Sequence, residues 1–136
     1  MPFVLGESMN KTTIEMLKIY KPYSNLDWLN YKLVREQATF HHIEKREDGG
    51  KQIITNGAIL MPIPHQYLHI IECKDIKTYT TLNKMFKIIN NQRYEPTRDQ
   101  REIMECLLQD FEYHHSDDRN AKGKLLIKDE YRKRYL

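Results

Sequence analysis

Four of the six histidines in the chain lie in one segment, between Thr39 and His69. His41 and His42 are adjacent, whereas His65 and His69 are four residues apart. On a helix, side chains four residues apart share a face, so two imidazoles at this spacing can ligate one divalent ion. Three protein ligands would leave a coordination position open for water or a phosphate oxygen, as in catalytic metal sites. The spacing therefore indicates a metal-dependent site.

If the adjacent histidines, His41 and His42, lay on a strand, their side chains could have two different functions. Neighbouring side chains on a strand point to opposite faces, so one imidazole can ligate an ion while the other faces a substrate. A neutral histidine beside the ion can take a proton from an attacking water. The helical pair alone is a weak signal, because such spacing arises by chance on many helices. The two pairs together are a much rarer combination.

The residues around the histidines predict the elements that would position them. Residues 38–45 combine aromatic and branched side chains as a strand does, and the paired glycines at 49–50 indicate a turn. Residues 52–60 predict a second strand, interrupted at Asn56. Prolines then end that strand, and Pro64 is expected to begin a helix. The expected core comprises Phe40, Ile43, Ile59, Leu60, Leu68 and Ile71.

The flanking segments predict helices. Residues 10–20 have helical periodicity that stops before Pro22, and residues 24–37 predict a second helix capped by Ser24. A third is expected up to residue 91, and Thr97 with Gln100 forms the capping-box signature of a fourth. The chain thus predicts one α+β domain over residues 1–136. Its helical N-terminal part spans 10–37, its motif core 38–72 and its helical C-terminal part 75–136. The element that would end the chain is of uncertain type.

The bulk composition narrows the class of protein. A net charge of +3 and a pI near 8.8 are compatible with a polyanionic partner but are weak indicators alone. No run approaches the roughly eighteen apolar residues of a membrane span, so no membrane partner is expected. Cys73 and Cys106 are far apart in sequence. A disulfide between them stays open, but buried thiols in a reducing cytoplasm are the favoured interpretation.

The order His-His, Asn, His-x-x-x-His on strand, loop, strand and helix resembles the HNH nucleases, the ββα-metal or His-Me finger group. Within that group the nuclease colicins are the most similar pattern, and the resemblance covers about residues 38–72. It implies a metal-dependent endonuclease with a ββα-metal core wrapped by helices. The implied partner is nucleic acid, with double-stranded DNA expected, and the implied cofactor is one divalent ion (Mg²⁺, Mn²⁺, Ni²⁺ or Zn²⁺).

The resemblance also implies a role for each residue of the motif. His42 would be the general base that activates water. His41, His65 and His69 would be the metal ligands. Asn56 would hold the loop, and thereby the base, through side-chain hydrogen bonds to the backbone; in some members of the family this asparagine contacts the metal instead.

Basic side chains beside the motif are candidates for gripping phosphates. These are Lys45, Arg46 and Lys51, with further help expected from Arg132, Lys133 and Arg134. Glu72 lies one helical turn past His69 and either orients that imidazole or faces solvent. The chain lacks the Cys-x-x-Cys zinc pairs that frame many HNH fingers, and it has no recognisable DNA-reading module. We therefore expect binding with little sequence preference.

Two other functions fit parts of the pattern. An inactive relative could keep the fold and bind nucleic acid, but it would need neither the base nor an open metal position. A structural zinc site in an interaction domain would have no use for His42. The second doublet, His114-His115, is not followed by a helical pair and suits a helix C-terminus for electrostatic reasons alone.

Overall fold

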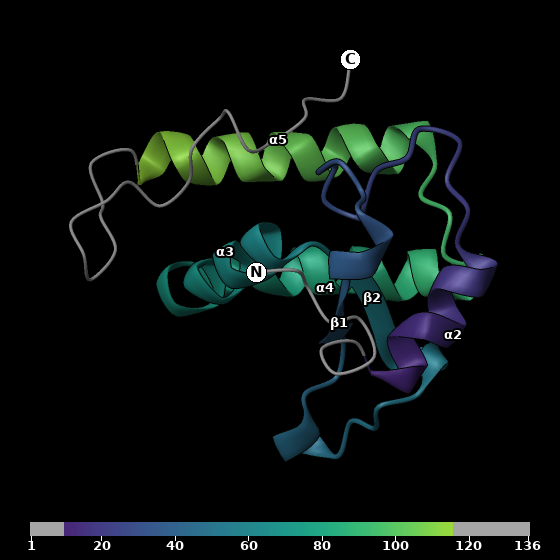
Figure 1. Cartoon of the computed structure of the whole chain (residues 1–136). Coiled ribbons are helices and arrows are strands. Elements are labelled where there is room, and N and C mark those ends of the chain that lie inside the picture. Colours follow the sequence, from purple (N-terminus) through teal and green to yellow (C-terminus); the bar gives the residue numbers. More distant parts are fainter. Residues whose placement is uncertain (1–9, 116–136) are drawn as a thin grey trace, which may run out of the picture.

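The computed structural model describes residues 10–115 and confirms an α+β fold. This part of the chain forms a two-stranded antiparallel sheet and four α-helices, the last of which lies across one side of the molecule (Figure 1). The α-helices and strands are α2 (Lys11–Ile19), β1 (Thr39–His42), β2 (Gly57–Leu60), α3 (Pro62–Lys74), α4 (Ile76–Asn91) and α5 (Arg98–His114). Single 3₁₀ turns occupy Arg35–Gln37, Arg46–Asp48 and Ile54–Asn56.

The two strands form where they were expected but are shorter. They pair in antiparallel register, with His41 opposite Ala58 and His42 opposite Gly57. A side chain at Gly57 would collide with the ring of Phe40 and the sulfur of Met16, so the close approach of α2 to the sheet requires glycine here. The interruption expected at Asn56 is a 3₁₀ turn that leads directly into β2.

Helix α3 begins two residues earlier than expected, at Pro62 instead of Pro64. Both prolines lie in the first turn, where a missing backbone N–H leaves no hydrogen bond unmade. Five of the six expected core residues are buried, and Ile43 is partly buried against the same core. Helices α2, α4 and α5 are confirmed, as is the capping box at the start of α5.

The helix predicted over residues 24–37 is wrong. Asp27 Oδ1 accepts hydrogen bonds from the backbone N–H groups of Leu29 and Tyr31, both at 2.9 Å. Asn25 and Asn30 take left-handed backbone angles, with φ of 54° and 69°. Aspartate and asparagine compete with a helix in this way, because their side chains bond the nearby backbone. The segment is therefore a buried turn, and only Arg35–Gln37 is helical, as a single 3₁₀ turn.

A buried polar network holds this turn in place. Arg101 of α5 donates from Nη1 to Asp27 O at 2.7 Å and to Asn30 Oδ1 at 3.0 Å. Its Nη2 donates to the hydroxyl of Tyr20 at 3.0 Å. Asp27 Oδ2 in turn accepts from the N–H of Met61, at 2.8 Å. The network therefore links the N-terminal segment, the junction before α3, and α5.

Some expectations are corrected or lie outside the described residues. Cys73 and Cys106 are free and exposed, so the expected buried thiols are wrong. Residues 10–115 contain no helix of the length and apolarity that a membrane crossing needs. The basic cluster 132–134 and the final element lie outside the described residues.

Replacing Arg101 with leucine should destabilise the fold strongly. The change leaves the buried acceptors of Asp27, Asn30 and Tyr20 without their donor, and loss of one partner from such a network costs about 3–5 kcal/mol. Urea denaturation would measure the free energy of unfolding. Arg98→Leu is the matched control, because that side chain is 71% exposed on the same helix and its loss should cost within about 0.5 kcal/mol. Equal effects of the two changes would contradict the role given to the network.

Candidate active site

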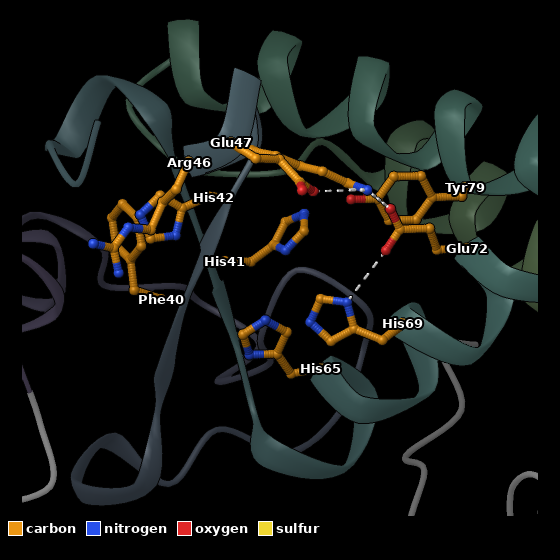
Figure 2. A pocket seen from close by; sticks show the side chains of 10 residues that line it. Phe40, His41, His42, Arg46, Glu47, His65, His69, Glu72 and Tyr79 are labelled. Carbon is orange, nitrogen blue, oxygen red and sulfur yellow. Dashed lines mark hydrogen bonds and ion pairs between the residues drawn. The ribbon is translucent and has the colours of Figure 1, made fainter. Parts of the chain in front are cut away.

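An open cavity of about 530 Å³ lies between β1, the loop that follows it, α3 and the start of α4. Figure 2 shows the side chains that line it, and they include all four histidines of the motif. The lining residues are Phe40, His41, His42, Lys45, Arg46, Glu47, His65, His69, Glu72 and Tyr79. Of the residues expected at the site, Asn56 and Lys51 do not line this cavity.

The structure brings three imidazoles together in this cavity. The ring centroid of His41 is 5.4 Å from that of His65 and 6.2 Å from that of His69, and the last two are 5.0 Å apart. Figure 2 shows the rings turned toward one another, with one nitrogen of each directed into the space between them. Two imidazole nitrogens about 2.1 Å from one ion would place their centroids roughly 5 Å apart. The observed spacings are close to that value or up to about 1 Å wider.

Hydrogen bonding fixes the proton on His65. The hydroxyl of Thr39 donates its one proton to Leu60 O at 2.7 Å, so it must accept from His65 Nδ1, which also lies at 2.7 Å. The proton of this ring is therefore on Nδ1, and Nε2 carries a free lone pair. Burial lowers the pKa of His65 to about 4, which keeps the ring neutral near pH 7.

Glu72 holds the third imidazole. Its Oε1 lies 3.5 Å from His69 Nδ1, and its other oxygen pairs with Lys45. Burial alone would raise the pKa of Glu72, but the hydrogen bonds from Lys45 and His69 lower it below its ordinary value. A carboxylate only accepts, so it favours a proton on Nδ1 of His69.

His41 is the most deeply buried of the four, with 2% of its surface exposed. Burial lowers its pKa to about 3, so the ring is neutral. Its Nε2 lies 2.8 Å from Asn83 Oδ1, a residue of α4. The rings of Tyr79 and Phe86, also on α4, pack edge-on around it.

The three imidazoles are suitable metal ligands, but their present spacing is too wide for a shared ion. As the side chains stand in residues 10–115, no three or more His, Cys, Asp or Glu form a group that could hold an ion. His41, His65 and His69 nevertheless each have one ring nitrogen beside an acceptor, the usual arrangement of histidine ligands. Movement of the rings by about 1 Å would bring the spacings to those of a shared ion.

His42 lies on the opposite side of β1 from His41 (Figure 2). Burial and the nearby cation of Arg46 both lower its pKa, so the neutral form that can accept a proton is favoured. Its ring packs edge-on against Phe40, with centroids 4.8 Å apart. Its Nε2 is covered and has no hydrogen-bond partner among the described residues.

Asn56 fastens the loop that follows β1. Its Oδ1 accepts from the N–H of Glu44 at 2.8 Å, and its Nδ2 donates to the carbonyls of Glu44 and Lys51, both at 3.0 Å. Gly50 closes the same loop, because a Cβ there would overlap the carbonyl of Glu44. The amide thus ties both ends of residues 44–51 to the turn before β2.

The three basic residues expected to bind phosphate differ in whether they line the cavity and in whether an acidic side chain pairs with them. Lys45 is paired with Glu72 and lies 3.7 Å from Glu47, so its charge is largely balanced. Arg46 lines the cavity, whereas Lys51 is exposed outside it. The cavity wall therefore carries two cationic and two acidic side chains, Lys45 and Arg46 against Glu47 and Glu72.

The contribution of α4 was missed by sequence reasoning. Asn83, Lys87 and Asn90 share one face of this helix and donate hydrogen bonds to backbone carbonyls of Ile43 and of residues 54–57, at 2.8–3.2 Å. One sequence signal for these hydrogen bonds is the position of Asn90, which continues the apolar stripe of α4. An amide buried on such a stripe needs a hydrogen-bond partner from another segment.

Comparison of the chain with family models, with curated proteins and with solved structures finds no match in any of the three.

Replacing Asn56 with alanine should loosen the loop over residues 44–51. Three hydrogen bonds are removed, and we expect destabilisation of about 1–2 kcal/mol with faster amide exchange in this loop. Asn56→Asp keeps the acceptor for Glu44 N–H but cannot make either donated bond, so its effect should be intermediate. Amide hydrogen exchange would rank the variants, with the exposed Gln52→Ala as the control. Unchanged exchange in Asn56→Ala would show that the loop is held by other interactions.

Proposed function

We propose that residues 39–74 form a ββα-metal core, the catalytic core of the His-Me finger nucleases. The observation that carries this proposal is the meeting of three imidazoles in one open cavity, those of His41, His65 and His69. His42 supports it from the opposite side of the same strand. The elements follow one another as strand, strand and helix, which is the order that the resemblance implies.

Within that class we propose an HNH endonuclease, a cytoplasmic enzyme that hydrolyses phosphodiester bonds of nucleic acid, with double-stranded DNA expected. His42 is the general base and takes a proton from the attacking water. The cation of Arg46 suits this role, because it disfavours the protonated ring. Asn56 fastens the loop that begins two residues after the base and so limits its movement.

His41, His65 and His69 would hold one divalent ion, Mg²⁺, Mn²⁺, Ni²⁺ or Zn²⁺. When bound, the ion would act as a Lewis acid on the scissile phosphate and stabilise the leaving 3′-oxygen. The protein contributes three imidazole rings, each with one nitrogen directed into the space between them. Thr39 and Glu72 hold two of these rings, through the nitrogen that faces away from the others.

Nucleic acid would be held through its phosphates by Arg46 and Lys51, and by Lys45 once a phosphate competes with Glu72 for its charge. Such contacts carry no sequence information. The balanced charge of the cavity wall predicts that the cavity alone attracts a polyanion only weakly. Basic residues outside it, including the cluster 132–134, would then supply much of the affinity.

Replacing His42 with alanine should reduce cleavage by about two to four orders of magnitude, the usual cost of losing a general base. The measurement is nicking of plasmid DNA in separate incubations with Mg²⁺, Mn²⁺, Ni²⁺ and Zn²⁺. His114→Ala is the matched control, because that histidine is exposed at the C-terminal end of α5 and does not line the cavity, so its loss should leave the rate unchanged. Robust cutting by His42→Ala would refute the role of this residue.

Calorimetry with the same ions distinguishes the alternatives. Alanine at His41, His65 or His69 should weaken ion binding far more than alanine at His42. Binding of DNA without cutting in any ion would indicate an inactive relative of the nucleases. Tight binding of Zn²⁺ with neither DNA binding nor cutting would indicate a structural zinc domain. If His41→Ala binds ions as tightly as the parent, the strand ligand is misassigned.

Reversing the charge at Arg46 with glutamate should weaken binding to unrelated duplexes alike. If Arg46 neutralises one phosphate, the change should reduce the slope of log affinity against log salt by about one. Fluorescence anisotropy over a salt series measures both the affinity and this slope, with Arg98→Glu on the exposed face of α5 as the control for net charge. A strong preference for one sequence that survives high salt would show that interactions with the bases dominate.

A further inference from the structure

The amide of Asn83 is fixed in orientation by two hydrogen bonds. Its Nδ2 donates to the carbonyl of Ile43 at 3.1 Å, which leaves Oδ1 facing Nε2 of His41 at 2.8 Å. An amide oxygen accepts and never donates, so the proton of the His41 ring must be on Nε2. The ring is neutral, and its Nδ1 therefore carries the lone pair.

The lone pair of His41 faces the other two imidazoles. Figure 2 shows the ring of His41 with one nitrogen directed toward His65 and His69. If the ring turned over by 180°, carbon atoms would replace both nitrogens at their present places. Asn83 would then be left without its hydrogen bond, and a carbon would face the cavity. The hydrogen bond from His41 to Asn83 therefore selects both the protonated nitrogen and the orientation of the ring.

We propose that Asn83 is a positioning residue that presents Nδ1 of His41, and not Nε2, as a ligand for a divalent ion in the cavity. The proposal rests on the proposed function in one respect only, the use of the three histidines to hold an ion. Asn83 lies on α4, beyond the segment that resembles the nuclease motif.

Other residues of α4 hold the amide of Asn83 in position beside His41. Lys87 and Asn90 fasten the same face of the helix to backbone carbonyls in residues 54–57. Phe86, on α4 between Asn83 and Lys87, packs 5.7 Å from the His41 ring, measured between centroids. Helix and strand are thus joined at several points around the amide, and the acceptor cannot move away from the imidazole without breaking several interactions.

The decisive measurement is the tautomer of His41, read from the ¹⁵N chemical shifts of its imidazole in metal-free protein without nucleic acid. We expect the parent to hold the proton on Nε2. Asn83→Leu should give a mixture of tautomers, whereas Asn83→Asp retains an acceptor and should keep the proton on Nε2. Asn91→Leu, the same change at an exposed position of α4, should have no effect.

Affinity for Ni²⁺ alone, measured by calorimetry, gives the second readout. Loss of a group that orients a histidine ligand typically costs about 10–100-fold in affinity. We expect that loss for Asn83→Leu, with Asn83→Asp within a few-fold of the parent. A parent protein with the proton on Nδ1 of His41 would overturn the proposal, even if Asn83→Leu failed to fold. Equal Ni²⁺ affinities for Asn83→Leu and Asn91→Leu would also overturn it.

The two proposals fail in different ways. If the parent binds Ni²⁺ with the expected tautomer but cuts no DNA with any ion, the nuclease proposal fails and the role of Asn83 stands. If the parent cuts DNA while its His41 carries the proton on Nδ1, the nuclease proposal stands and the role of Asn83 is refuted.

Discussion

One buried guanidinium, that of Arg101, is the constraint on which the rest of the structure depends. A cation taken out of water must be matched by acceptors, and here these come from two segments remote from α5 in sequence. Asp27, drawn into the same network, accepts from the N–H of Met61, the residue that precedes α3. The start of the helix that carries His65 and His69 is thereby fixed from within the core. The geometry of the cavity follows from a network that does not touch it.

The cavity also depends on side chains outside it that donate hydrogen bonds to main-chain oxygens. Asn56 closes the loop after β1, and α4 fastens the turn before β2. Such bonds hold irregular backbone that lacks the regular ladder of a sheet. They explain how two strands of four residues, too short to be stable as an isolated hairpin, can carry the imidazoles at defined positions.

The sequence predicted the strands, the turn and the helix around the site well, because aromatic and branched side chains, paired glycines and prolines are local signals of strands, turns and helix starts. It failed at residues 24–37, where the apolar spacing is helical but Asp27 and two asparagines bond the backbone into a turn. Leu26 and Leu29 of this segment are buried, but in a turn and not in a helix. The partnership of Asn83 with His41 spans 42 residues. No local pattern encodes an interaction that only the packing of α4 creates.

The fastening of the hairpin by α4 bears on whether the motif can be moved between proteins. A segment comprising only residues 38–74 would retain the four histidines but lack the amide partner of His41 and the donors for residues 54–57. It would therefore not be a transferable cassette. Any graft of this centre onto another scaffold must carry α4 with it.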